Sequence, residues 1–217
     1  EMSLKIIDYI ANAGFGVIFP SKTIIIEEEN KVIILSPSNL EQKEIDTLRL
    51  NNKEIIFVAP NNFHNLHLSR MKSLFPKAHF FGPKRSAKQS GINLEDTRKL
   101  TLEETEIFYL EGNNTLAESC FYYKPSKTLI TTDLFFNMHH KMNFPTKVAM
   151  LCAGTYHKTA SSRAIKFTIK NKGLFKKSLK KLASLDIEKV IPSHGDSITK
   201  KEFIKWLNSS YLKQDQL

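Results

Sequence analysis

Three polar residues follow apolar, strand-like runs at widely separated points of the chain. His64 follows EIIFVA after a short loop, Asp133 ends KTLITT, and His194 follows EKVIP in the sequence PSHGD. Residues just beyond strand ends gather along one edge of a sheet in α/β proteins, so these side chains can converge. Two imidazoles and one carboxylate form an established ligand set for iron, and three protein ligands plus water are usual for catalytic zinc. The pattern therefore predicts a site for one divalent metal: zinc, iron or manganese.

Each of the three residues also has a structural interpretation. His64 falls on the helical face of Leu68 and Met71, where it would be a satisfied core histidine. Asp133 follows a strand and would cap the next turn. His194 lies in a loop after a buried strand, which is an unusual place for a packing residue, so it has the strongest individual claim to function. The other histidines are predicted to lie on the surface: His67, His79, His139, His140 and His157.

The chain has 217 residues, 41% of them hydrophobic, which predicts one globular domain spanning 1–217. The apolar runs are of strand length, well short of the ~20 residues of a membrane span, and no secretory signal is visible. Glu1 before Met2 suggests an added residue, with Met2 as the native start. Only two cysteines are present, Cys120 and Cys152, and their apolar surroundings predict free, buried thiols in a reducing, cytoplasmic compartment.

The net charge is +10, which leaves nucleic acid, an anionic membrane surface and acidic substrates open as partners. The densest basic stretch is KNKGLFKKSLKKL, a predicted helix with apolar residues on one face and lysines on the others. Such a helix is either surface-seeking or, as we favour, the solvated face of a lysine-rich protein. Neither a Cys/His finger nor an aromatic-interleaved RNA motif accompanies it. Charge alone therefore does not select the partner, and the oligomeric state does not follow from the sequence.

Strand-like runs open both halves of the chain. In the first half GVIF, KTIIIEE and KVIILSP predict hairpins with turns at Pro20-Ser21 and Glu28-Asn30. The predicted order then is the helix SPSNLEQKEIDTLRL, the strand EIIFVA, the helix HNLHLSRMKSLF, which His64 opens, the strand HFFG and a surface excursion over 84–99. In the second half EIFYL, SCFYY and KTLITT predict strands, followed by an irregular segment over 133–159, helices over 161–185, the strand EKVIP and a final helix. Two strand-rich halves, each followed by helices, predict an α/β (α+β) fold, a four-layer αββα sandwich.

This order, and the three strand ends, resemble the metallo-β-lactamase superfamily over most of the chain. SCFYYKPSKTLITTDLFF is similar to the family's stretch ending in its metal-bridging aspartate, and VIPSHGD to its last strand and last ligand histidine. NNFH, FPKAHFFGP, PSKTLITTDLFFN and PSHGD together resemble an uncharacterised bacterial branch. The resemblance implies an αββα sandwich with metal at the edge of its two sheets.

The family's defining run, T-H-x-H-x-D-H, is degenerate in this chain. Laid on VAPNNFH, only the final histidine matches, at His64, and the family's next histidine falls within LEGNNTLAES. The substituted positions are Ala59, Asn61 and Phe63 in the first run and Asn113 or Asn114 in the second. The resemblance therefore implies that His64, Asp133 and His194 remain for one metal, and that a second metal has lost its ligands.

Two functions stay open from the sequence. The first is a mononuclear metal-dependent hydrolase, in which the metal lowers the pKa of a bound water toward ~7 and the substrate is an unknown, anionic small molecule. Asp133 and Glu118 are its candidate catalytic carboxylates, with Glu118 as a substitute ligand or base or, equally, a turn residue. The second is a metal-free binding or scaffolding module, in which the amides of Asn61, Asn113 and Asn114 hold the strand ends. A weaker third is nucleic-acid binding, since related branches process RNA.

Overall fold

The computed structural model describes residues 2–212, which form two compact units. Within the described range, unit 1 comprises residues 2–9 and 22–103, and unit 2 comprises residues 10–21 and 104–212. The turn between the first two strands therefore belongs to unit 2, although most of both strands belongs to unit 1. The prediction of a single domain stays a prediction, and the expectation about Glu1 lies outside the described residues. No helix in the described range is both long and apolar enough to cross a membrane.

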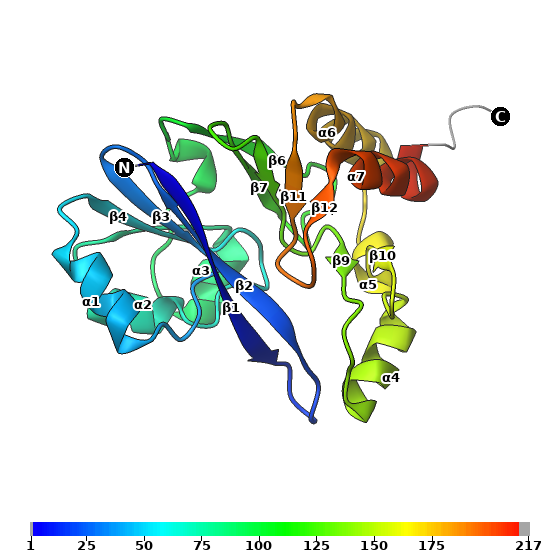
Figure 1. Ribbon diagram of the computed structural model, residues 1–217, viewed down its shortest axis with the longest axis horizontal. Helices are drawn as coiled ribbons and strands as arrows, with labels where there is room; N and C mark the ends of the chain where they lie inside the picture. The colour runs from blue at the N-terminus through cyan, green and yellow to red at the C-terminus, as the bar shows by residue number, and fades with distance from the viewer. Residues whose placement is uncertain (1, 213–217) are drawn as a thin grey trace. The chain divides into compact units, whose positions relative to one another are not determined.

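The sheet of unit 1 has five strands in the order β1-β2-β3-β4-β5. They are β1 (Ser3–Asn12), β2 (Ile18–Glu27), β3 (Lys31–Leu35), β4 (Glu54–Val58) and β5 (His79–Phe81). β2 pairs antiparallel with β3, whereas β3, β4 and β5 run parallel. Helices α1 (Gln42–Leu50) and α2 (Leu68–Leu74) pack on one face through a shared apolar core, followed along the chain by α3 (Lys84–Ser90) and the 3₁₀ turn η1 (Thr97–Lys99) (Figure 1).

One local prediction near the start of the chain is wrong, and two elements were not predicted. Pro20-Ser21 is not a turn, because β2 runs through it; its register with β3 reaches only Ile24, so Pro20 lies beyond that ladder and its missing N–H costs no bond there. The run before GVIF is itself a strand, β1. The excursion over 84–99 contains the helix α3, which ends at Gly91 in the left-handed conformation, φ 70°.

The sheet of unit 2 also has five strands, in the order β12-β11-β8-β7-β6. They are β6 (Thr105–Tyr109), β7 (Ser119–Tyr123), β8 (Thr128–Ile130), β11 (Lys189–Ile191) and β12 (Ile198–Thr199). All neighbours are antiparallel except β8 and β11, which run parallel. Helices α6 (Lys172–Ser184) and α7 (Lys200–Leu207) pack on one face, and the π-helical turn η2 (Asn208–Leu212) follows α7 (Figure 1).

The segment after β8, predicted to be irregular, contains regular elements. The short strands β9 (Phe136–Asn137) and β10 (Thr159–Ala160) pair with each other, and α4 (Phe144–Ala153) lies between them in the chain; α5 (Arg163–Phe167) follows β10. The Asn143 side chain caps α4 by accepting from Thr146 N, with Pro145 in the first turn. These caps, with Gly154 at the carboxyl end, specify a helix that apolar periodicity did not reveal.

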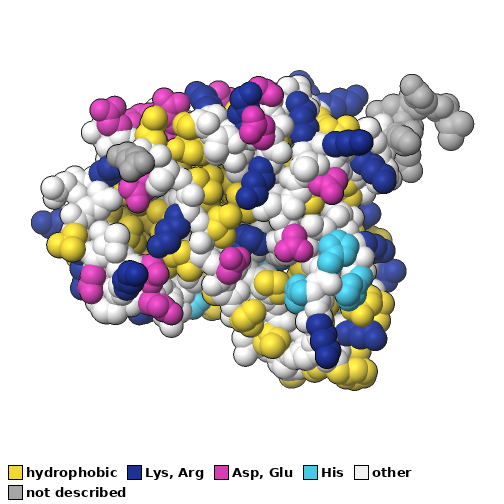
Figure 2. Space-filling view, viewed as in Figure 1, with side chains coloured by type: hydrophobic (Ala, Val, Ile, Leu, Met, Phe, Trp, Pro, Cys, Tyr) yellow, Lys and Arg dark blue, Asp and Glu magenta, His cyan; other side chains and the backbone are white. Residues whose placement is uncertain are grey.

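The basic helix α6 uses its apolar face inside unit 2. Phe175, Leu179 and Leu182 are all buried in the core, so the surface-seeking interpretation of this stretch is wrong and its lysines form a solvated face. On the face drawn in Figure 2, lysine and arginine side chains are distributed over much of the surface. The helix α7 begins with a capping box formed by Thr199 and Glu202.

Candidate functional site

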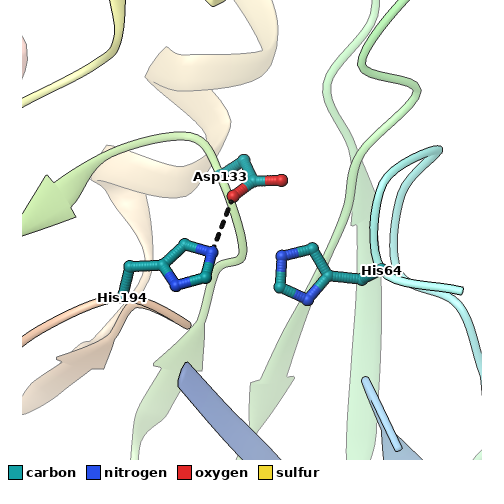
Figure 3. Close-up of side chains that lie close together, drawn as sticks. All are labelled: His64, Asp133 and His194. Carbon is teal, nitrogen blue, oxygen red and sulfur yellow. Dashed lines mark ion pairs between the residues drawn. The ribbon is translucent and has the colours of Figure 1, made fainter. Parts of the chain in front are cut away.

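Asp133 and His194 lie together in unit 2 at the carboxyl ends of two neighbouring strands. β8 and β11 run parallel with Ile130 opposite Ile191, so the residues that follow them start side by side. The Oδ1 atom of Asp133 lies 3.2 Å from Nε2 of His194 (Figure 3). Both side chains are more than nine-tenths buried. The structure thus brings together two of the three residues singled out in the sequence.

The second ring nitrogen of His194 is also engaged. Its Nδ1 atom lies 3.0 Å from the carbonyl oxygen of Pro20, a residue of β2 that belongs to unit 2. A carbonyl oxygen only accepts hydrogen bonds, so Nδ1 carries the hydrogen and donates it. The Nε2 atom faces the carboxylate of Asp133. It either carries a second hydrogen and donates it to that carboxylate, or it has a free lone pair that can bind a cation. A metal-ligating histidine typically has this arrangement, with its other nitrogen bonded to a carbonyl.

Two aromatic rings fix the plane of the His194 imidazole. Phe136 stacks on it with ring centroids 5.1 Å apart and an angle of 8° between the planes. Phe19 meets it edge-on at 4.8 Å. These contacts restrict rotation of the ring and leave the Nε2 edge directed at Asp133. Nothing in the sequence around Pro20, Phe19 or Phe136 identified them as neighbours of His194.

The loop that carries His194 is held against β9. The backbone N–H of Asn137 donates to the His194 carbonyl at 3.0 Å, and Asp196 N donates to the Asn137 carbonyl at 2.9 Å. Gly195 between them has φ 93°, a conformation that disfavours any other residue. A Cβ atom at position 195 would overlap the Asn137 backbone. The glycine of PSHGD is therefore required by the close approach of two backbones.

Glu118 lies behind Asp133 and is almost fully buried. Its Oε2 atom accepts from Asp133 N at 2.8 Å, and its Oε1 atom accepts from Thr132 N at 2.8 Å and Leu134 N at 3.4 Å. Hydrogen bonds to a carboxylate are stronger than neutral ones, so this side chain anchors the turn that presents Asp133. Burial, and secondarily the Glu118 charge, raise the pKa of the neighbouring Cys120 thiol well above its usual range. The contacts of Glu118 favour a structural role at this turn.

His64 belongs to unit 1, where it follows β4 on a turn organised by Asn61. The Asn61 side chain is buried, and its Oδ1 atom accepts from Phe63 N at 2.8 Å and His64 N at 3.0 Å. Such a side-chain-to-backbone turn competes with helix formation. The helix α2 accordingly begins at Leu68, so the prediction that His64 opens a helix, on the face of the core residues, is wrong. The His64 side chain is half-buried.

The substituted motif positions have structural roles within their own units. Ala59 is fully buried, and a Cβ on Gly82 would approach the Ala59 Cβ to 2.9 Å, so there is no room here for a larger side chain. Phe63 is half-exposed beneath the guanidinium of Arg85, 5.9 Å from the ring centroid. In unit 2 the Asn113 side chain donates to the Ile165 carbonyl and to Thr168 Oγ1 and accepts from Leu116 N, whereas Asn114 is exposed.

The remaining histidines and the cysteines differ in exposure. His67 is half-buried before α2, and burial, followed by the charge of Arg70, lowers its pKa. Cys120 is buried as predicted, but Cys152 is exposed on α4, so that prediction is wrong for the second thiol. Exposed, as predicted, are His79, His139, His140 and His157.

The fold is that of known metallo-β-lactamases. The metallo-β-lactamase from Pontibacter korlensis has a TM-score of 0.62 and 12% sequence identity, and the match covers 100% of this chain and 99% of that one. The DIM-1 metallo-β-lactamase exposed to ceftazidime has a TM-score of 0.61 and 13% identity, with coverage of 96% and 97%. The metallo-β-lactamase from Hirschia baltica has a TM-score of 0.57 and 12% identity, with coverage of 97% and 99%. No family model and no curated protein sequence matches this chain. At these identities the likeness shows the fold alone, a mixed α/β fold consistent with the predicted αββα sandwich.

Proposed function

We propose that this protein is a mononuclear metal-dependent hydrolase in which His64, Asp133 and His194 hold one divalent metal. The three residues supply two imidazoles and one carboxylate, a group that could hold such an ion. Likeness to metallo-β-lactamases over the full chain supports this class of site, because that fold family binds divalent metals. Zinc, iron and manganese all accept this donor set.

The observation that carries the proposal is the setting of the His194 ring. Its Nδ1 atom donates to the Pro20 carbonyl, and its Nε2 atom is 3.2 Å from a buried carboxylate. A cation at this point would satisfy both Nε2 and Asp133 without a change in either contact. Two aromatic rings and the bonded loop backbone hold the imidazole in this orientation, so little ordering would accompany metal binding.

Only one metal is expected. The resemblance places Ala59, Asn61 and either Asn113 or Asn114 where the fold family has the ligands of its other metal, and the amides of Asn61 and Asn113 already bond backbone groups. None of them supplies an imidazole. A dinuclear centre would therefore need ligands from elsewhere in the chain.

The bound metal would supply a Lewis acid and an acidified water for hydrolysis. Within the chain, Asp133 offers a carboxylate oxygen next to that position as a proton acceptor, and Glu118 fixes its backbone through the N–H of Asp133. Phe136 and Phe19 shield one side of His194 from water. The net charge of +10 favours an anionic small-molecule substrate.

A metal-free binding or scaffolding module is the second candidate, and one contact favours it. Asp133 and a doubly protonated His194 would form a complete buried ion pair at 3.2 Å without any metal. The apolar Phe63 at a position where the family has a charged ligand favours the same interpretation.

Metal binding by the purified protein separates the two candidates. Protein purified without chelator should contain at most one equivalent of metal, and a calorimetric zinc titration of the metal-free chain should give one site. The variants His194→Ala and Asp133→Asn should lose that site, whereas His157→Ala, an exposed histidine of the same unit, should retain it. Zero equivalents after incubation with zinc, iron and manganese would favour the metal-free module, and two would show that the ligands are misassigned. Hydrolysis of anionic ester and amide substrates by the loaded protein then tests the reaction class.

A further inference from the structure

The helix α4 and the turn between β1 and β2 form one continuous surface in unit 2, here called the α4 lobe (residues 12–18 and 143–153). Ile18 N donates to Thr146 Oγ1 at 2.9 Å, and that hydroxyl donates to the Ile18 carbonyl at 2.8 Å. The Asn143 side chain donates to the Gly16 carbonyl at 2.9 Å. Because these bonds join the two segments, their outward side chains make up one surface.

The outward side chains of the α4 lobe are apolar. Phe15 is fully exposed at the tip of the turn, and Phe144 is 78% exposed at the start of α4. Val148 and Leu151, which follow Phe144 by four and seven residues, are also exposed and share its helical face. Ile18, in the strand bonded to Thr146, is partly exposed as well. The opposite side of the helix, with Thr146 and Met150, is buried. In a soluble protein, the outward face of a helix whose other face is buried is normally polar. The exposed apolar face of α4 therefore indicates a binding surface.

The sequence segments that contain the α4 lobe carry lysine and arginine but no aspartate or glutamate. Residues 134–185 contain eleven lysines and arginines and no aspartate or glutamate, and residues 9–26 contain no acidic residue either. Lys147 lies on α4 between Phe144 and Leu151, Lys141 precedes the helix by three residues, and Arg163 donates to the Cys152 carbonyl at the end of α4. In Figure 2, apolar and basic side chains lie together over the part of unit 2 that carries α4. Residues 134–185 as a whole, with the lysines of α6 included, therefore account for the positive surplus of the chain.

We propose that the α4 lobe binds the surface of an anionic lipid bilayer. Phe15, Phe144 and Leu151 would enter the boundary between headgroups and acyl chains, and the lysines beside them would meet the lipid phosphates. Aromatic rings flanked by basic residues on an interfacial helix are typical of this mode of binding. The metal site is not involved, so this inference is independent of the proposed function.

Charge and side-chain type favour lipid over the other occupants of such a surface. A second copy would bring another face without acidic residues against the first, and like charges would oppose that contact. Single-stranded nucleic acid stacks its bases on aromatic rings, but the aliphatic Ile18, Val148 and Leu151 offer no stacking surface. Aliphatic and aromatic side chains together match the acyl boundary of a membrane.

Vesicle co-sedimentation of the full chain tests the proposal. We expect binding to phosphatidylcholine vesicles that contain phosphatidylglycerol, much weaker binding to phosphatidylcholine alone, and weakening by salt. Phe144→Asp and Leu151→Asp should each reduce the partition coefficient by about tenfold or more. Leu50→Asp is the matched control, because Leu50 is 83% exposed on α1 of unit 1, and it should bind like the parent. Phe15→Ser provides a variant at a fully exposed site, where folding is not at risk.

Each other outcome overturns the proposal. The proposal fails if the parent does not bind anionic vesicles. It also fails if Phe144→Asp, Leu151→Asp and Phe15→Ser all bind them as the parent does. A single-stranded RNA oligonucleotide that binds the parent and Phe144→Asp equally, while vesicles do not bind, would assign the basic surface to nucleic acid. A doubled mass in light scattering that Phe144→Asp abolishes would assign the lobe to a second copy. Melting curves of every variant, matched to the parent, establish that the losses are local.

Discussion

Substitution of Glu118 by glutamine should destabilise the protein although it removes only one charge and changes no volume. In the structure Oε1 accepts from Thr132 N and Oε2 from Asp133 N, both at 2.8 Å, in almost complete burial. A glutamine can keep one of these bonds, but its amide nitrogen then faces a second N–H donor. Loss of a charge-assisted bond costs about 1.5–3 kcal/mol, and an unpaired buried donor adds to it, so we expect a loss of about 3 kcal/mol. For a chain of this size that is a fall in Tm of roughly 6–12 °C.

The assay is chemical denaturation followed by circular dichroism, with Glu106→Gln as the matched control. Glu106 is half-exposed on β6 and its Oε1 lies 3.3 Å from Lys124 Nζ, so its loss should change stability by less than ~1 kcal/mol. Because Glu118 acts through the turn that holds Asp133, Glu118→Gln should also weaken zinc binding, whereas Glu106→Gln should not. If Glu118→Gln melts like the parent and binds zinc equally, the assignment of Glu118 as a positioning residue is refuted.

Three further predictions follow from single contacts. Gly195→Ala should cost at least about 2 kcal/mol in chemical denaturation, because a Cβ at φ 93° would overlap the Asn137 backbone; a variant as stable as the parent would contradict this geometry. Asn61→Ala should cost about 1–3 kcal/mol whether or not metal is present, since two backbone N–H groups lose their acceptor, and a loss seen only with metal would argue against a structural role. With a thiol reagent near pH 8 the folded chain should react at Cys152 alone and the denatured chain also at Cys120, whose pKa burial raises; two fast thiols in the folded chain would be inconsistent with that burial.

Much of the fold was predictable because its signals are local. Runs rich in isoleucine and phenylalanine specify the central strands, and the Thr199 capping box specifies the start of α7. The pairing of Asp133 with His194 followed from the rule that residues beyond strand ends share an edge, and here β8 and β11 are direct parallel neighbours. A strand-end rule therefore identified the central pair without any intact family motif.

The rest depended on contacts between distant residues. Pro20 reads as a turn residue, yet it lies in β2, and its carbonyl bonds the ring of a residue 174 positions later. The sequence NNFHNLHL has helical periodicity, but the Asn61 side chain captures two N–H groups and delays the helix to Leu68. The apolar residues around Cys152 in the sequence also predicted a buried thiol, whereas Cys152 lies on the side of α4 that faces solvent. In each case long-range packing or a side-chain bond overrides the local pattern.

The central claim is that one metal binds His64, Asp133 and His194, and X-ray absorption at the zinc edge tests it most directly. The protein loaded with one equivalent should show nitrogen and oxygen neighbours at about 2.0–2.2 Å, with outer-shell scattering from two imidazoles and no sulfur. In His64→Ala and His194→Ala the scattering from two imidazoles should be lost, and the spectrum of His157→Ala should match the parent. A zinc environment with sulfur, or one that neither His64→Ala nor His194→Ala alters, would contradict the claim.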